Sequence, residues 1–263
     1  MESLVDIGAN LAHDSFDDDS DEVLRRAAEA GVSRIVVTGR SDESNRKAAQ
    51  LAQEHPGVLW STAGVHPHHA SDYTDDSDAQ IRKLAAAGRV VAIGECGLDY
   101  FRNFSPREAQ LEAFKAQLDI AAETGLPVFL HQRDAHDDFV EVLEPMLPEL
   151  SRAVAHCFTG EHESLREYLA LGLYIGVTGW ICDERRGAHL KEIVSIIPDD
   201  RLMIETDAPY LLPRTIKPKP KTRRNEPMYL PEVLRVTAEA RGQSEAHVAK
   251  ITTENAQKFF ELG

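Results

Sequence analysis

The stretch Val90–Glu95, VVAIGE, is a short apolar run that ends on a carboxylate. Other segments end an apolar run on an imidazole or a carboxylate in the same way: Pro127–His131 (PVFLH), Ala153–His156 (AVAH) and Leu202–Asp207 (LMIETD). A parallel β/α barrel directs the C-terminal ends of its strands toward one pocket. We therefore expect these four terminal side chains to converge there and to bind a divalent metal ion.

Along the chain, short runs of β-branched residues alternate with amphipathic stretches. The predicted strands are Leu4–Ile7, Arg34–Thr38, Val58–Ala63, Val90–Gly94, Val128–His131, Ala153–His156, Leu173–Val177 and Leu202–Ile204. Between most of them the spacing of apolar residues is helical, as at Ser105–Glu123. Ser105 is predicted as the N-cap of that helix, with Pro106 at its first position and Gly125 as its stop.

Two further helices, Pro231–Ala240 and Glu245–Glu261 with Ser244 as its cap, are predicted at the end of the chain. Eight strand–helix repeats without a break in composition predict an α/β protein, a single (β/α)8 TIM-type barrel over residues 1–263. Barrels of this kind reach such a length as one domain.

Composition excludes several classes of protein. Hydrophobic residues make up 42% of the chain, enough for a large core, but there is no apolar run long enough for a membrane span. The N-terminal segment MESLVDIGAN lacks the features of a signal peptide, and three cysteines are too few for a disulfide framework. We therefore expect a cytoplasmic protein, a monomer without membrane contact.

Charge is unevenly distributed in a chain whose net charge is −15. Asp14–Glu22 holds six acids and no base, whereas Arg214–Arg224 holds six bases and no acid. The net charge argues against a general nucleic-acid binder, but the basic, proline-rich run predicts local attraction of a polyanion, with Arg223 and Arg224 as phosphate contacts. The alternative is that some of these bases pair with Glu226, Glu232 and the acidic run.

Near the first and third predicted strands the evidence for ligands is weaker. Metal-dependent barrel hydrolases often carry His-x-His on the first strand, where this chain has Gly8 and Asn10. Asparagine is a poor ligand for a transition metal, so Asn10 is predicted to bind substrate. His66 follows Gly64 and is predicted to line the pocket as a substrate contact, while His68 and His69 are predicted to lie at the surface.

The strand ends themselves carry the chemistry. Glu95 stands close to glycines in IGECGLD, and a buried carboxylate there would be costly without a partner, so a metal or base role is predicted. Asp99 is expected in the following loop. His131 and His156 on successive strands are predicted ligands, and Arg133 either holds a phosphate or pairs with Asp134.

Asp207 ends the last strand, where it is predicted to bind the metal or to take the proton from a water molecule. The role of Glu205, two residues earlier, is left open.

Several of these segments together resemble the TatD family of metal-dependent nucleases: AGVHPH (63–68), IGECGLD (93–99), PVFLH (127–131), HCFTG (156–160), IETDAPYLLPR (204–214) and RRNEP (223–227). The resemblance runs nearly from end to end. It implies a barrel enzyme that removes nucleotides from the 3′ end of single-stranded DNA and RNA, in DNA repair. It also implies metal binding at Glu95, His131, His156 and Asp207, with Mg²⁺ as activator, although two imidazoles suit Mn²⁺ or Zn²⁺ better.

The predicted function is therefore hydrolysis of phosphodiester bonds, with Glu95 and Asp207 as catalytic residues. One alternative is another metal-dependent barrel hydrolase, acting on an amide, a lactone or an aminoacyl ester. A second alternative, prompted by the missing His-x-His, is a nucleic-acid-binding module without catalysis.

Overall fold

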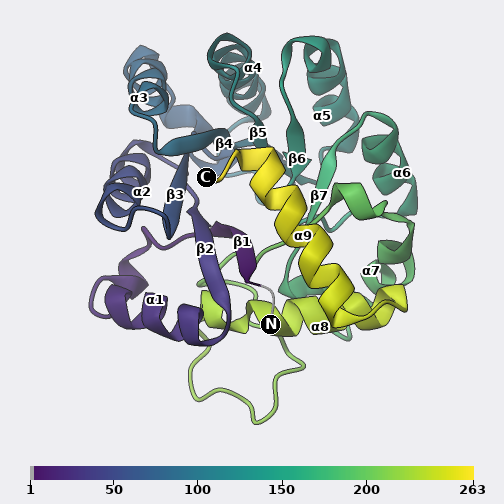
Figure 1. Ribbon diagram of the computed structural model, residues 1–263. Coiled ribbons are helices and arrows are strands. Elements are labelled where there is room, and N and C mark those ends of the chain that lie inside the picture. Colours follow the sequence, from purple (N-terminus) through teal and green to yellow (C-terminus); the bar gives the residue numbers. More distant parts are fainter. Residues whose placement is uncertain (1–2) are drawn as a thin grey trace. The chain divides into compact units, whose positions relative to one another are not determined.

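The structure, a computed structural model, describes residues 3–263. One sheet holds eight strands in the order β1-β2-β3-β4-β5-β6-β7-β8. The strands are β1 (Leu4–Ala9), β2 (Val32–Val37), β3 (Leu59–Ala63), β4 (Val90–Asp99), β5 (Val128–Arg133), β6 (Ala153–Ala155), β7 (Tyr174–Val177) and β8 (Leu202–Ile204). An α-helix follows each strand along the chain (Figure 1). This alternation is that of the (β/α)8 TIM-type barrel and confirms the predicted fold class.

The helices are α1 (Ser20–Glu29), α2 (Asp42–Glu54), α3 (Asp75–Ala86), α4 (Arg107–Thr124), α5 (His136–Leu143), α6 (His162–Ala170), α7 (Ala188–Ile193), α8 (Leu230–Arg241) and α9 (Glu245–Phe260). Short 3-10 helices lie between them: η1 (Asp14–Phe16), η2 (Pro67–Asp72), η3 (Glu144–Glu149), η4 (Gly179–Cys182), η5 (Val194–Ile196), η6 (Asp199–Arg201) and η7 (Pro227–Tyr229). Within residues 3–263, no helix combines the length and the apolar character that a membrane span requires.

Contacts between residues divide the chain into two compact units. The first comprises Met1–Val36, Cys157–Leu169 and Tyr174–Gly263, and the second comprises Val37–His156 and Ala170–Leu173. That residues 1–263 form a single domain stays a prediction.

In the second unit, strands β3 to β6 pair in parallel. Helices α2, α3 and α4 pack against β3 and β4, each in contact with the next (Figure 1). All ten residues of β4 are buried, and Phe114 of α4 stacks on Phe139 of α5 with ring centroids 5.4 Å apart. The carboxyl ends of β4 and β5 are thus held on a closely packed apolar base.

The predicted N-cap of α4 is wrong. The helix begins at Arg107, and Pro106 is its N-cap. The Ser105 hydroxyl instead donates to the carbonyl of His68 and accepts from the amide of Ser71, which ties the start of α4 to η2. The predicted stop is confirmed, because Gly125 adopts the left-handed conformation, with φ at 69°.

In the first unit, β7 and β8 pair in parallel, and α9 packs on β1, β8 and α8 (Figure 1). Backbone hydrogen bonds of 2.8 and 2.7 Å join Asp207 to Gly8 and Asn10 to Ala208. The chain segments at the ends of β1 and β8 therefore lie side by side. Ser244 caps α9 as predicted, since its hydroxyl accepts from the amide of His247.

Candidate active site

Strand β4 presents Glu95 through an irregularity in its pairing. The register between β4 and β5 shifts between Ile93 and Cys96. Gly94 lies within this shift and Gly97 follows it, each with φ at 136°, and a Cβ atom at either position would lie within 2.2 Å of a carbonyl oxygen of β5. Only glycine allows the two backbones to approach so closely there. The strand therefore continues to Asp99, five residues beyond its predicted end.

Three imidazoles converge on one oxygen of the buried Glu95 carboxylate. Oε1 lies 2.8 Å from Nε2 of His156, 3.0 Å from Nδ1 of His131 and 3.2 Å from Nε2 of His66. His131 lies on β5, and His156 directly follows β6, as the sequence predicts. One ligand atom from each of His66, Glu95 and His131 lies within 4.8 Å of the others. Together with His156, these side chains form the histidine–carboxylate cluster, which has the donor atoms of a divalent metal site.

Charge within the cluster is consistent with that chemistry. Burial lowers the pKa of His66 to about 3, so its imidazole is neutral. Burial opposes ionisation of Glu95, but His66 and His156, with the hydrogen bonds from His131 and His156, hold its pKa well below the usual value. Arg40 adds a guanidinium 3.7 Å from Oε2 of Glu95. The cluster thus combines an ionised carboxylate with at least one neutral imidazole.

Asp99 supports His131 from the opposite side of the ring. Its Oδ2 lies 3.3 Å from Nε2 of His131 and 2.8 Å from Nε2 of His68. Burial lowers the pKa of His131, but its hydrogen bonds to Asp99 and Glu95 outweigh this effect and raise it. Two predictions are therefore wrong: Asp99 is a buried end of β4 and not a loop residue, and His68 is half-buried against it. His69 is exposed, as predicted.

Asn10 and Asp207 meet in the first unit. The Asn10 amide donates to Oδ1 of Asp207 over 2.9 Å, and Asn10 is 3% exposed. Oδ1 of Asn10 is buried and has no hydrogen-bond partner within residues 3–263. This arrangement fixes the orientation of the carboxylate and leaves one buried acceptor beside it.

Asp6 lies deeper in the same unit. It accepts from the amide of Thr206 at 2.9 Å and from its hydroxyl at 2.5 Å, and burial raises its pKa to about 7. It holds the segment after β8 against β1.

The bases of the run Arg214–Arg224 differ, because some pair with acids and others are exposed. Arg224 donates to Asp19 and Glu226, and its guanidinium lies over the ring of Phe16. The alternative interpretation, pairing with the acidic run, thus applies to Arg224, and we do not retain it as a phosphate contact. Arg214 pairs with Glu184. Other bases of the run are exposed: Lys217, Lys219, Lys221 and Arg223.

Comparison with known proteins identifies the family to which the chain belongs. The family model described as TatD related DNase matches residues 5–261. The chain belongs to this family. It is therefore a member of a family of hydrolases that act on ester bonds of nucleic acids.

Relatives of this TatD-related chain match nearly its whole length. A protein of Erwinia tasmaniensis named 3′-5′ ssDNA/RNA exonuclease TatD is 52% identical over 98% of the chain and 100% of the relative. A hydrolase TatD family protein from Entamoeba histolytica has a TM-score of 0.89 at 28% identity, covering 100% of this chain and 99% of the other. The TatD homologue YJJV from Escherichia coli K12 also has a TM-score of 0.89, at 29% identity and 98% coverage of both chains.

Sequence reasoning missed part of the cluster of this TatD-family chain. The sequence predicts His66 to line the pocket as a substrate contact but does not predict that it lies against Glu95 with the other imidazoles. Its side chain accepts from the amide of His68 at the start of η2, so the segment His66-Pro67-His68 folds back on itself. Pro67 at the start of η2 is the sequence feature that accompanies this turn.

Proposed function

We propose that this protein is a metal-dependent 3′–5′ exonuclease that hydrolyses single-stranded DNA and RNA. The observation that carries the proposal is the convergence of His66, His131 and His156 on Glu95 in a chain of the TatD-related DNase family. The name of the Erwinia relative supports the direction of digestion and the single-stranded substrate.

The donor set supports a divalent cation. We propose that Glu95, His131 and His156 hold it, joined by His66, with Asp207 as a further candidate. A bound divalent ion supplies a Lewis acid that polarises the phosphoryl oxygen and makes water more acidic. The family resemblance implies Mg²⁺, while three imidazoles favour Mn²⁺ or Zn²⁺. We therefore expect the latter two ions to bind more tightly than Mg²⁺.

Side chains of the protein supply the general base and the contacts to water and phosphate. Asp207, held by the Asn10 amide, accepts the proton of the attacking water as general base. The unpartnered Oδ1 of Asn10 accepts a hydrogen bond from that water. Arg133 and Arg223, with the exposed lysines of the basic run, hold the phosphates of the strand.

The biological setting belongs to the proposal as well. A role in DNA repair, a cytoplasmic location and a monomeric state are expectations from the sequence, and we carry each of them forward as part of the proposed function.

The decisive assay uses single strands labelled at the 5′ or the 3′ end, with Mg²⁺, Mn²⁺ and Zn²⁺ compared. We expect progressive shortening from the 3′ end, and internal cuts would instead indicate an endonuclease. Asp207→Asn should nearly abolish hydrolysis while leaving oligonucleotide binding measurable by fluorescence anisotropy. Full activity of that variant would remove the base role, and hydrolysis of small esters with no oligonucleotide cleavage would favour the other hydrolase.

A further inference from the structure

Two exposed aromatic rings lie on the segment that follows Asp99 of β4. Phe101 is 55% exposed and Phe104 is 68% exposed, both in the segment that joins β4 to α4. We infer that these two rings receive nucleobases of the single strand whose phosphodiester bond is hydrolysed, an inference that rests on the proposed nuclease function.

The segment is anchored to the cluster itself. Asp99, which contacts His131, also accepts from the amide of Arg102 at 2.8 Å through Oδ1. At the other end, the Ser105 hydroxyl donates to the carbonyl of His68. The side chain of Gln110 donates to the carbonyls of Asp99 and Ser105 over 3.2 and 2.8 Å. Both ends of the segment are therefore fixed, so its backbone need not be ordered when a ligand binds.

Phe104 continues a row of rings that begins inside the cluster. The ring centroid of Phe104 lies 4.8 Å from that of His68, and His68 lies 4.1 Å from His66. Only the ring of His68 thus lies between Phe104 and His66 of the cluster. A base stacked on Phe104 would lie outside the cluster, with its phosphate free to reach toward it.

Phe101 is paired with a cation. The guanidinium of Arg133, at the end of β5, lies 4.2 Å from the centroid of the Phe101 ring, and that of Arg102 lies 5.6 Å away. Each nucleotide of a single strand offers one aromatic face and one phosphate. Aromatic rings that stack bases, combined with arginines that contact the backbone, are the means by which proteins bind single strands without sequence preference.

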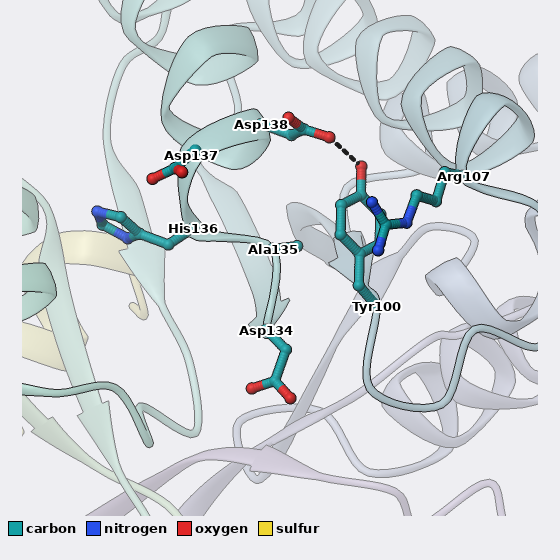
Figure 2. A pocket seen from close by; sticks show the side chains of 7 residues that line it. All are labelled: Tyr100, Arg107, Asp134, Ala135, His136, Asp137 and Asp138. Carbon is teal, nitrogen blue, oxygen red and sulfur yellow. Dashed lines mark hydrogen bonds between the residues drawn. The ribbon is translucent and has the colours of Figure 1, made fainter.

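Tyr100, although adjacent, is not part of this surface. Unlike Phe101, Tyr100 is only partly exposed, and its hydroxyl donates to Asp138 over 2.6 Å (Figure 2). It lines a separate cavity of about 380 Å³ together with Arg107, Asp134, Ala135, His136, Asp137 and Asp138 (Figure 2). Three carboxylates in that lining would repel phosphates, so the strand is expected on the side of Phe101 and Phe104.

Binding and cleavage are tested separately. A 5′-fluorescein oligoadenylate is compared with the same strand carrying abasic residues at its two 3′-terminal positions. Anisotropy is measured in EDTA, which makes binding independent of hydrolysis. We expect Phe101→Ala and Phe104→Ala each to raise Kd about fivefold or more on the normal strand, since base stacking on an aromatic ring contributes this much. On the abasic strand the variants should differ little from the wild type.

Conservative variants separate a stacking role from a structural one. Phe104→Trp should keep affinity, Phe104→Leu should lose it, and Val58→Ala, an exposed apolar residue just before β3, should change nothing. In steady-state hydrolysis the alanine variants should raise KM more than they lower kcat. Unchanged Kd in both alanine variants, or an equal loss on abasic and normal strands, would overturn the inference. Absence of hydrolysis by the wild type would instead refute the nuclease function and leave the anisotropy result valid.

Discussion

Nε2 of His131 lies 3.3 Å from Oδ2 of Asp99, while Nδ1 of the same ring lies 3.0 Å from Oε1 of Glu95. The imidazole therefore connects two carboxylates, one on each side. A histidine that binds a metal through one nitrogen commonly donates its other N–H to a carboxylate, which fixes the tautomer and the ring orientation. Asp99 occupies that position relative to His131, and it also contacts His68.

Replacing Asp99 by asparagine should weaken the metal site without removing a ligand. Loss of such a supporting carboxylate typically reduces metal affinity about 10- to 100-fold. Isothermal titration with Mn²⁺ measures the change directly, and Asp138→Asn, which alters a carboxylate bonded to Tyr100, is the control. Equal Mn²⁺ affinity in Asp99→Asn and the wild type would show that Asp99 has no such role.

Glu95→Gln should abolish the stabilisation of the fold by metal. An ion that binds only the folded state at a hundredfold excess over its Kd stabilises that state by about 2.7 kcal/mol. For a chain of this size, that corresponds to a rise in Tm of about 5 °C or more. Scanning calorimetry with and without Mn²⁺ should show this rise in the wild type and in Glu108→Gln, an exposed control on α4, but not in Glu95→Gln. A metal-dependent rise retained in Glu95→Gln would contradict the assigned ligand set.

Some residues of the candidate site could be predicted from the sequence, and others could not. Glu95, His131 and His156 were predictable, because each follows an apolar run and the carboxyl ends of parallel strands meet at one edge. Asp99 was not, because the register shift between Ile93 and Cys96 interrupts the alternation by which a strand is recognised. A strand predicted to end at Gly94 leaves Asp99 in a loop.

Contacts between residues far apart in the sequence explain the other differences between prediction and structure. Arg224 belongs to a run of bases that predicts phosphate contact, yet its guanidinium lies 2.7 Å from Asp19, 205 residues away in the sequence. The local sequence around His68 is typical of a surface loop, and only the extension of β4 to Asp99 provides the partner that half-buries it. In both cases the partner is set by tertiary structure, which local patterns of charge and hydropathy do not contain.

Asn10→Ala should lower kcat while leaving binding intact. The Asn10 amide is a hydrogen-bond donor to Asp207, and a bond to a charged group is worth about 1.5 kcal/mol or more, so a decrease of roughly tenfold is expected. Single-turnover cleavage measures the rate, and anisotropy in EDTA should give the Kd of the wild type. A variant that cleaves at the normal rate would show that the orientation of Asp207 does not depend on Asn10.

Substitution of Arg223 should change binding, whereas substitution of Arg224 should change stability. Arg223 is exposed, so Arg223→Ala should reduce the slope of log Kd against log salt by about 0.7, the value of one phosphate contact on a single strand. Arg224 bonds Asp19 and the largely buried Glu226, so Arg224→Ala should destabilise the fold by about 1–3 kcal/mol. Urea denaturation measures the stability of both variants, and salt titrations measure the slope of log Kd against log salt. An unchanged salt slope in Arg223→Ala would remove it from the phosphate contacts.

The stability of the protein should depend on the titration of Asp6. Burial raises the pKa of this carboxyl in the folded state to about 7, from 3.8 as its ordinary value. The folded state therefore binds more protons than the unfolded state between those two values, and the free energy of unfolding falls as pH rises through that range. Above a pH of about 7 the carboxyl is ionised in both states, and the loss is complete.

Asp6→Asn should remove this pH dependence. The introduced amide cannot titrate, yet it can donate to the Thr206 hydroxyl while its oxygen accepts from the Thr206 backbone amide. The variant should consequently gain about 2–3 kcal/mol relative to the wild type between pH 5 and pH 8. Urea denaturation at both pH values measures the difference, with Asp119→Asn on the exposed face of α4 as the control for loss of charge. If the stability of Asp6→Asn relative to the wild type stays constant or falls over this range, Asp6 is already ionised in the folded state at pH 5.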